Sequence, residues 1–315
     1  MMQQHTVPTP YPVGDVHIYT VEMEGELILF DTGPPTEQAL ASLKANVDLD
    51  RLQHVFITHC HVDHYGLANY LGKHSNARIY LPHKDAVKIQ YHRRRLDGIE
   101  TILNELGFDR QYLKQFRETV SSAGIFPDFP QGYQVVEESD ILERLGCSFL
   151  TCPGHSQSDL VYIGGDWAVT GDTLLRGIFQ APLLDLDLDT LSSRFDNYGA
   201  YCATLHQMKN LYGRRIFPGH RQDIDSLDAT ILFYIDKLLD RAERIRKFRH
   251  EEDIRQIIRQ LFGSDRDDPF HTYLKVSEIV FMRDFLNRPD QLREALVYLD
   301  LFEAVAEKFV KLTTN

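Results

Sequence analysis

The sequence predicts an α/β fold, because two kinds of hydrophobic pattern alternate along the chain. Short apolar runs such as 55–57 are rich in β-branched and aromatic residues, which is typical of buried strands. Longer stretches, at 84–120 and from 228 onward, repeat apolar residues every three or four positions, which is typical of helices. With 315 residues, 43% of them hydrophobic, the chain can bury a large core, and we expect one main domain with helical appendages.

A dense cluster of candidate metal ligands follows the predicted strand 55–58. Within six residues the chain has four side chains of metal-ligand type, which are His59, His61, Asp63 and His64. Residues 66–71 are predicted to open a helix, so the cluster lies at a strand-to-helix turn, where α/β sheets bind ligands. Imidazole together with carboxylate suits zinc, iron or manganese. The alternative is a surface turn that is merely rich in histidine, but such histidines normally come singly.

The region from about Lys84 to Val120 is predicted to be helical. Its apolar residues fall on two successive faces, which are Ile99, Ile102, Leu103 and Leu106, then Leu113, Phe116 and Val120. The region ends in a proline-rich loop at 127–130, and we interpret it as an insertion between two strands. Its basic run, 92–95, is expected to lie on a solvated helix face.

Three further strands are each predicted to end just before a residue of metal-ligand type. The runs 149–151, 169–171 and 216–217 are followed by His155, Asp172 and His220. Taken alone, each would more often be a capping aspartate or a turn histidine. Gly164-Gly165 predicts a hairpin turn. The leucine and aspartate alternation at 184–189 is expected to be an exposed edge segment or loop rather than a cation site.

From Asp228 onward the chain is predicted to form several helices. Apolar residues have helical spacing in three stretches, which are Ile231, Ile235, Leu238, Ala242 and Ile245; Ile254, Ile257, Ile258 and Leu261; and Leu292, Leu296, Leu299, Phe302 and Val305. Core packing alone explains these stripes. The functional interpretation is that these helices and the insertion cover the site or form a homodimer surface, since an apolar roof would give substrate selectivity. Phe126 and Phe129 are the candidate pocket residues of such a roof.

The order of these motifs, together with Phe30-Asp31-Thr32-Gly33, resembles that of the metallo-β-lactamase superfamily. The resemblance covers roughly residues 12–225. It implies a four-layer αββα sandwich with metals at one edge, between the two sheets. The expected organisation is a metallo-β-lactamase-like domain at 1–225, with a helical insertion at about 84–130, and a helical C-terminal extension at 226–315.

The resemblance also implies how the metal ligands are divided. One metal would be bound by His59, His61 and His155, the other by Asp63, His64 and His220, and Asp172 would bridge both. Asp31 matches a position whose carboxylate orients a ligating histidine and fixes its tautomer. A simple turn residue before Gly33 is an equally good interpretation of Asp31 from the sequence.

Two divalent ions in such a centre would favour hydrolysis. Ions about 3.5–4 Å apart can share a water, lower its pKa toward about 7 and polarise the oxygen under attack. Asp63, bound to one metal, would accept the proton or pass it to the leaving group, which makes it the catalytic candidate. Zinc is the expected metal, with iron or manganese as alternatives. The added helices resemble those of glyoxalase II and lactonase-type hydrolases, which implies a small thioester, ester or lactone substrate.

Particular residues argue for or against other activities that are known in the superfamily. An oxygen-reducing diiron branch usually has glutamate at the position of His61, which weakens that interpretation. The persulfide dioxygenases keep a similar cluster but bind a single iron, so they remain an alternative. Superfamily nucleases insert a large domain between the equivalents of Asp172 and His220, where this chain has 47 residues. A regulatory protein that retains metal for stability is the last alternative.

Charge and cysteine content limit the classes of partner and the cellular compartment that we expect. The chain has 34 Lys and Arg residues and 46 Asp and Glu residues, which gives a formal net charge of −12. Such a charge would repel nucleic acid. Residues 1–15 show no secretory pattern and no stretch approaches transmembrane length, so a cytoplasmic protein without membrane contact is expected. Four cysteines without Cys-x-x-Cys spacing fit free thiols. Cys60 is interpreted as a buried structural thiol that points away from the metals.

Overall fold

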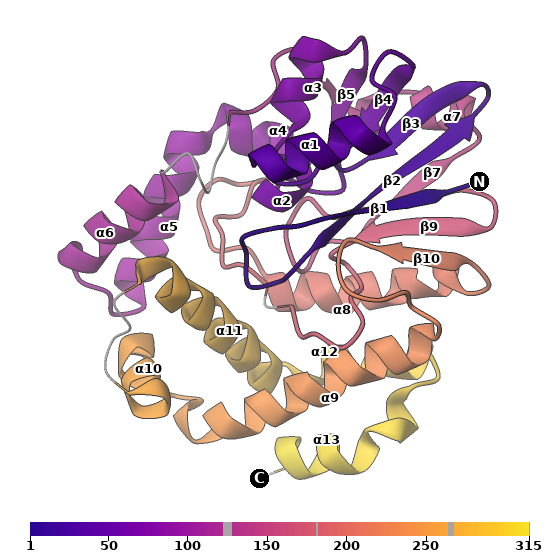
Figure 1. The fold of residues 1–315 in the computed structure, drawn as a ribbon. Coiled ribbons are helices and arrows are strands. Elements are labelled where there is room, and N and C mark those ends of the chain that lie inside the picture. The colour runs from indigo at the N-terminus through magenta and orange to yellow at the C-terminus, as the bar shows by residue number, and fades with distance from the viewer. Residues whose placement is uncertain (122–127, 181, 264–267, 315) are drawn as a thin grey trace.

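Two β-sheets form the centre of the protein in a computed structural model that describes residues 1–121, 128–180, 182–263 and 268–314 (Figure 1). Within these residues, the strands of the first sheet lie in the order β1 Gln3–Val7, β2 Val16–Met23, β3 Glu26–Phe30, β4 Leu52–Phe56, β5 Arg78–Leu81 and β6 Gln134–Val135. The strands of the second sheet lie in the order β10 Arg215–Pro218, β9 Trp167–Gly171, β8 Leu160–Ile163 and β7 Ser148–Thr151.

Both sheets are mixed, and strand direction brings the predicted site residues to one edge. In the first sheet β1, β2 and β3 are antiparallel, whereas β3, β4, β5 and β6 run parallel. In the second sheet β10 is parallel to β9, and β7 shares the direction of β9 because both are antiparallel to β8. Within each sheet, the strands that precede the predicted ligands therefore end on the same side.

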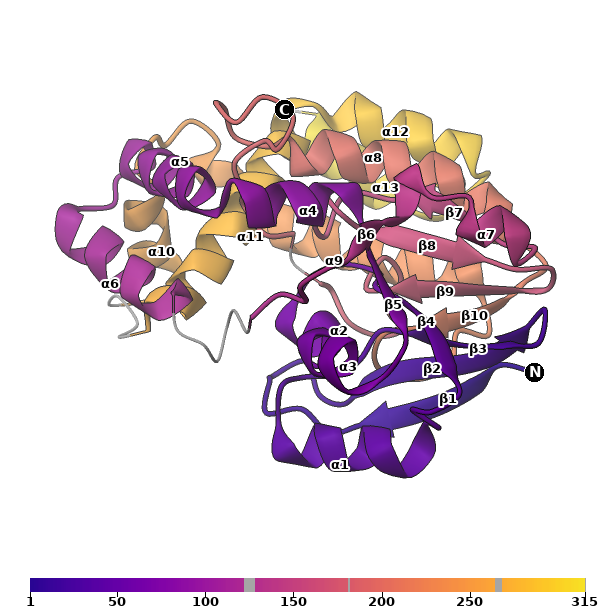
Figure 2. The same cartoon turned by 90° about the horizontal axis from the view of Figure 1, so that it is seen from above.

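Helices cover the outer faces of the two sheets, which gives four layers (Figure 2). The first sheet is covered by α1 Glu37–Asn46 and α3 Ala68–His74, and the second by α8 Asn197–Gln207 and α9 Leu227–Ile245. On the outside of these two helices, α12 Pro289–Tyr298 packs against α8 and α13 Ala306–Thr313 packs against α9. Short segments of α-helix or 3₁₀-helix connect the layers at α2 Val62–Tyr65, α7 Ile141–Arg144, η1 Val136–Glu138, η2 Met208–Leu211, η3 Arg246–Phe248 and η4 Phe302–Ala304.

The alternation of side chains along the strands produces these layers. On β8, Leu160 and Tyr162 face the first sheet, whereas Val161 and Ile163 face the helices on the other side. Separate buried clusters lie between the two sheets and on the outer face of each sheet. Period-two burial on both sheets is what an αββα sandwich requires. The predicted fold class is confirmed.

A helical group extends one end of the sandwich. We call the helices α5 His92–Glu105, α6 Arg110–Val120 and α11 Pro269–Asn287 the helical roof; α4 His83–Gln90 leads into it and α10 Ile254–Phe262 packs against α11. The stretch from α4 to α6 lies between β5 and β6 in the sequence, as the insertion was predicted to lie. Position 225 falls between β10 and α9, and the division into two units there stays a prediction.

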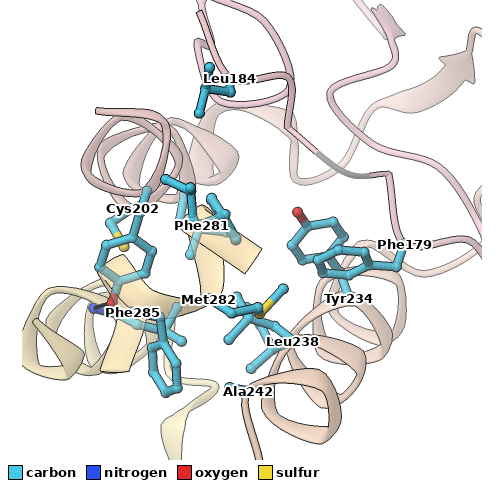
Figure 3. Close-up of a cluster of buried hydrophobic side chains, with 14 of the residues drawn as sticks. Phe179, Leu184, Cys202, Tyr234, Leu238, Ala242, Phe281, Met282 and Phe285 are labelled. Carbon is cyan, nitrogen blue, oxygen red and sulfur yellow. Dashed lines mark hydrogen bonds between the residues drawn. The ribbon is translucent and has the colours of Figure 1, made fainter. Parts of the chain in front are cut away.

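The helix α11 joins the roof to the core. Its residues Phe281, Met282 and Phe285 pack among side chains of α8 and α9, including Leu238 and Ala242 (Figure 3). The apolar stripe predicted for α9 is buried as expected. No separate stripe was predicted for α11, because its buried residues surround most of the helix instead of following one face.

The turns and loops near the site differ from the sequence predictions at some positions and agree at others. The hairpin at Gly164-Gly165 is confirmed between β8 and β9. The chain becomes helical at Val62, earlier than predicted, so the metal-ligand cluster itself begins a short helix. The segment 184–189 is a loop, but the prediction that it is exposed is wrong, because its leucines and Asp185 are buried.

The basic run 92–95 is only partly solvated, contrary to the prediction. Arg93 and Arg94 are exposed, but Arg95 turns inward and pairs with Asp185. The four cysteines are free, as predicted. Across the described ranges, no helix has the length and hydropathy needed to cross a membrane.

Candidate metal centre

Seven side chains of metal-ligand type meet at the edge where the strands of both sheets end. They come from the turn after β4 and from the ends of β7, β9 and β10, and they are His59, His61, Asp63, His64, His155, Asp172 and His220. Every one of these residues was predicted as a ligand from the sequence. Their convergence depends on the two sheets packing face to face, which places turns far apart in the sequence next to each other.

Three histidines form the first group. The Nε2 atom of His59 lies 2.9 Å from Nδ1 of His61, and Nε2 of His155 lies 3.0 Å from the same atom. The three ligand atoms lie within 4.8 Å of one another. Such a set of imidazole nitrogens around one point is typical of a transition-metal site.

The second group combines a carboxylate with two imidazoles. Nε2 of His220 lies 3.2 Å from Oδ2 of Asp63, and Nε2 of His64 lies 4.0 Å from Oδ1 of Asp63. All three side chains are buried. This grouping matches the division of ligands that the family resemblance implied.

Asp172 lies between the two groups. Its Oδ1 atom is 3.4 Å from Nε2 of His64 and 3.6 Å from Nε2 of His220, both in the second group. Its Oδ2 atom is 3.7 Å from Nε2 of His155, in the first group. One oxygen therefore faces each group, which is the geometry that a bridging carboxylate needs.

The unpaired polar atoms of the centre fit metal ions. Nε2 of His64, Nε2 of His220 and Oδ1 of Asp172 are buried and have no hydrogen-bond partner among the described residues. Buried polar atoms without partners cost free energy unless a ligand satisfies them. Since nitrogen and carboxylate oxygen are the donors that zinc, iron and manganese bind, the residues fit two such ions.

A set of hydrogen bonds behind the ligands fixes their orientation. Oδ2 of Asp31 lies 2.8 Å from Nδ1 of His64, and the same carboxylate accepts hydrogen bonds from the backbone N and Oγ1 of Thr58. Asp31 has a φ of 57°, in the left-handed region that non-glycine residues rarely adopt. Of its two interpretations, the structure favours orientation of a histidine over a simple turn.

Two more ligands are held in the same way by groups that the sequence did not reveal. Nδ1 of His220 lies 2.7 Å from the carbonyl oxygen of Asp15, and Nδ1 of His59 lies 3.1 Å from Oγ1 of Thr58. In each case the second ring nitrogen, Nε2, is directed to the centre. Such partners fix the tautomer that a metal ligand requires. The role of the Asp15 carbonyl could not be predicted, because every residue has a backbone carbonyl and the identity of the residue does not show which one is used.

Glycine makes room for the centre at the end of β10. A Cβ atom built on Gly219 would lie 2.7 Å from Oδ1 of Asp172 and 2.7 Å from Cε1 of His64. Real Cβ atoms do not approach other atoms so closely. The Pro-Gly-His sequence at 218–220 therefore places its backbone against the centre in a way that a side chain at position 219 would prevent.

Electrostatics in the centre favours bound cations. Burial holds the pKa of His59 and of His61 well below the ordinary value, so both imidazoles are neutral and able to ligate. Burial also opposes protonation of His64, but the carboxylates of Asp172, Asp31 and Asp63 raise its pKa well above the ordinary value. The carboxylates thus draw positive charge to the second group, a role that a metal ion would take over.

Cys60 stands apart from the ligand atoms. Its backbone N–H donates to Oδ2 of Asp85 at 2.8 Å. Burial, followed by the charge of Asp85, raises the pKa of the Cys60 thiol well above the ordinary value. A buried, protonated thiol is a poor metal ligand and a poor nucleophile, which agrees with a structural role.

A cavity of about 540 Å³ opens beside the centre. The ligands His61, Asp63, His155 and Asp172 line part of it, and the helical roof contributes the mostly apolar side chains Leu96, Ile99, Phe116, Val120, Phe270, Tyr273 and Leu274. Phe129, a predicted pocket residue, also lines the cavity, and its ring stacks on Tyr65 at 4.7 Å. Phe126, the other predicted pocket residue, lies outside the described residues.

Several polar residues of the cavity wall were missed by sequence reasoning, among them two cations and a carboxylate close to the insertion. Lys88 and Arg95 project from α4 and α5, and Asp185 comes from the loop after β9. Lys88 pairs with Asp85 at 2.8 Å, and Arg95 pairs with Asp185 at 2.7 Å. Position 85 lies one helical turn before Lys88, which is the spacing that could have indicated that pair. Arg95 and Asp185 are 90 positions apart, so no local signal connects them.

The comparisons with known proteins agree with this geometry. The family model described as the metallo-beta-lactamase superfamily matches residues 11–252. The chain is 29% identical over 276 residues to "Probable metallo-hydrolase YqjP" of Bacillus subtilis (strain 168), covering 81% of this chain and 83% of that protein. It is 28% identical over 171 residues to "Hydroxyacylglutathione hydrolase" of Xylella fastidiosa (strain 9a5c), covering 53% of this chain and 48% of that protein.

Solved structures share the whole architecture. The metallo-beta-lactamase family protein TTHA1429 from Thermus thermophilus superposes with a TM-score of 0.70 at 18% identity, covering 92% of this chain and 94% of that one. A beta-lactamase domain protein from Burkholderia ambifaria gives a TM-score of 0.71 at 18% identity, covering 90% and 86%. At this identity the likeness concerns the fold, and it includes the C-terminal helices because the coverage extends over nearly the full chain.

Proposed function

The chain belongs to the metallo-β-lactamase superfamily, and we propose that it is a dinuclear metal-dependent hydrolase of a small thioester, ester or lactone. The similarity to a protein named as a metallo-hydrolase supports metal-dependent hydrolysis. The shorter similarity to hydroxyacylglutathione hydrolase, which spans about half of each chain, supports an acyl substrate. The observation that carries the dinuclear proposal is the position of Asp172, with one carboxylate oxygen facing each group of ligands.

The ligands would hold two divalent ions between the sheets. The first group, His59, His61 and His155, and the second group, Asp63, His64 and His220, would each bind one ion, with Asp172 shared. When bound, such a pair supplies an activated water and polarises the carbonyl under attack. Asp31 and the Asp15 carbonyl would keep the imidazoles in place throughout turnover.

Asp63 is the proposed catalytic carboxylate. It lines the cavity, and Oδ2 lies beside Nε2 of His220. Burial alone would raise the pKa of Asp63, but His64 and His220 lower it below the ordinary value, so the carboxylate is ionised. An ionised carboxylate at the cavity wall can accept a proton from the attacking water and return it to the leaving oxygen or sulfur.

A hydrolysis assay on metal-analysed protein tests this proposal. Protein reconstituted with zinc, iron or manganese is assayed with thioesters, lactones and simple esters, and a chelated sample serves as the control. We expect cleavage that chelation abolishes. Asp63→Asn should lower kcat by about a hundredfold or more when metal is retained, whereas Asp50→Asn, at an exposed position, should behave as wild type.

Two results would overturn the proposal. If the metal-replete protein cleaves none of these substrates above the chelated control, a ligand-binding or regulatory protein becomes the better account. If it binds one iron per chain and consumes oxygen with a persulfide substrate, the mononuclear dioxygenase is the better account.

A further inference from the structure

One cation in the cavity wall differs from the others in how it is paired. Arg95 lies on α5, and its side chain is 11% exposed. Its Nε donates to both carboxylate oxygens of Asp185, at 2.7 and 3.0 Å. Among the described residues these are the only hydrogen bonds of the Arg95 side chain, so its terminal nitrogens, Nη1 and Nη2, have no protein partner. They are not among the buried unpaired atoms, and they are therefore reached from the cavity that Arg95 lines.

The neighbouring cations use their terminal nitrogens. Nζ of Lys88 contacts Asp85 at 2.8 Å and donates to Oγ of Ser158 at 3.1 Å. Nη1 of Arg241 and Nζ of Lys275 contact the carboxylate of Glu278, at 2.7 and 3.2 Å. Of these four cations, Arg95 alone is paired through Nε and not through a terminal nitrogen. The forked end of its guanidinium, Nη1 and Nη2, is therefore free of protein partners.

The loop that carries Asp185 is held firmly in position. Nε2 of Gln157 donates to the carbonyl oxygen of Leu186 at 2.8 Å, and Oε1 of Gln157 accepts from the backbone N of Leu188 at 3.0 Å. Oγ of Ser277, on α11, accepts from the backbone N of Leu184 at 3.0 Å. These bonds fix the loop to both the sandwich and the roof.

Close packing of α5 on this loop completes the arrangement. A Cβ atom built on Gly98 would lie 2.6 Å from Cδ1 of Leu186, so the helix can approach the loop because residue 98 has no side chain. Gly98 lies one helical turn after Arg95, on the same side of α5. The packing of α5 on the loop and the ion pair with Asp185 therefore hold the guanidinium of Arg95 in one orientation. Its free end is preorganised, so little side-chain freedom would be lost when a ligand binds.

We propose that Arg95 is a specificity-determining residue that binds a carboxylate on the acyl substrate, in the part of the cavity that α5 lines. This inference rests on the proposed hydrolase function. A guanidinium presents paired N–H groups that match the two oxygens of a carboxylate. The terminal N–H groups are open to the cavity, where a substrate carboxylate would replace water and form charge-assisted hydrogen bonds with them.

The apolar wall of the cavity defines the remainder of the substrate. Leu96, Ile99, Phe116 and Phe129 line the same cavity as Arg95 and the metal ligands. Apolar side chains favour a hydrocarbon segment over a polar one. The substrate class is therefore an acyl compound with a reactive carbonyl at one end of a short hydrocarbon chain and a carboxylate at the other.

Binding of dicarboxylic acids tests the inference without turnover. The zinc-loaded protein is titrated by calorimetry with the linear dicarboxylates from succinate to sebacate, and with the monocarboxylate of the same carbon number in each case. We expect one range of chain lengths in which the dicarboxylate binds roughly tenfold or more tightly than its monocarboxylate. This comparison uses wild-type protein and needs no variant to fold.

Variants then assign the preference to Arg95. Arg95→Gln should abolish the preference, and Arg95→Lys should retain only part of it because the ammonium has no fork. The control is Arg94→Gln on the same helix, where the side chain is exposed, and it should keep the wild-type preference. A dicarboxylate preference that is equal in wild type and Arg95→Gln, or absent at every chain length, would overturn the inference.

The outcome is separable from that of the proposed function. Hydrolysis of acyl substrates without any dicarboxylate preference would contradict the role of Arg95 alone. A dicarboxylate preference that depends on Arg95, in a protein that hydrolyses no acyl compound, would contradict the hydrolase proposal and leave Arg95 as part of an anion-binding site.

Discussion

The metal centre and the helical roof meet at the same cavity but are built in different ways. The centre gathers carboxylate and imidazole side chains from the short segments that follow strands of both sheets. The roof is made of long helices whose inner faces are largely apolar. We propose that this difference corresponds to a division of roles, in which the residues at the edge of the sandwich carry out the reaction and the roof selects the substrate.

The largest effect is expected from removing the shared carboxylate. Asp172→Ala should lower the occupancy of both ions together and reduce turnover by about a thousandfold or more, because Asp172 contacts both groups. His220→Ala should loosen one ion selectively. Metal analysis after dialysis against a weak chelator measures both results. If the Asp172→Ala variant retains two ions, Asp172 is not the carboxylate shared by both metal ions.

A smaller effect is expected one contact away from the ligands. Asp31→Asn keeps the size of the side chain but weakens its bond to Nδ1 of His64. Metal affinity should fall by about ten- to a hundredfold, the usual effect of losing such a partner. Competition with a chromogenic chelator measures the affinity. Equal affinity in Asp31→Asn and wild type would mean that the left-handed turn, and not the carboxylate, is what position 31 provides.

In the cavity wall outside the metal ligands, a change at Phe129, in the loop before β6, should alter selectivity without altering metal content. Phe129→Ala removes a ring that lines the cavity and stacks on Tyr65, so KM should rise and the preference for acyl length should shift by up to about tenfold. Kinetics across a series of acyl lengths provide the measurement, with metal occupancy determined in parallel. Phe262→Ala, at an exposed position on α10, is the control. Unchanged selectivity in Phe129→Ala would leave that ring as packing alone.

The smallest effect is expected at Cys60, which lies between two ligands but belongs to neither group. Because burial raises the pKa of its thiol, the thiolate fraction is below that of a free cysteine at every pH, and alkylation should stay slow from neutral to mildly alkaline pH. Mass spectrometry of iodoacetamide-treated native protein measures this. Cys60→Ala should change turnover by less than about twofold. Rapid alkylation, or a large loss of activity, would indicate a reactive thiol.

The two regions also differ in how far the sequence predicts them. The cluster at 59–64 could be recognised directly, because four ligands lie within six consecutive positions. His155, Asp172 and His220 could be found because each follows a short apolar strand, although their meeting at one edge came from the family resemblance. The function of Asp31 stayed open, since it depends on a left-handed backbone and on the position of His64 in space.

The roof was predicted as helices, but its polar pair was not predicted. Arg95 was expected on a solvated face because charged runs on helices usually are, and Asp185 was expected to be exposed because leucine and aspartate alternate there. Both expectations failed for one reason: α5 and the loop at 184–188 pack against each other, and contacts over 90 positions leave no periodic signal in the sequence. The turns that carry the metal ligands can be recognised from a few neighbouring residues. The wall of the cavity is formed by tertiary packing between distant segments, so the local sequence does not predict it.

The number of metal ions bound per chain is the most direct measure of whether the centre is dinuclear. Purified protein is reconstituted separately with zinc, iron and manganese, freed of excess metal and measured by elemental analysis against protein concentration. We expect two ions per chain with at least one of these metals, because the ligands form two groups and Asp172 has one oxygen directed to each. A reproducible maximum of one ion with every metal would contradict this expectation.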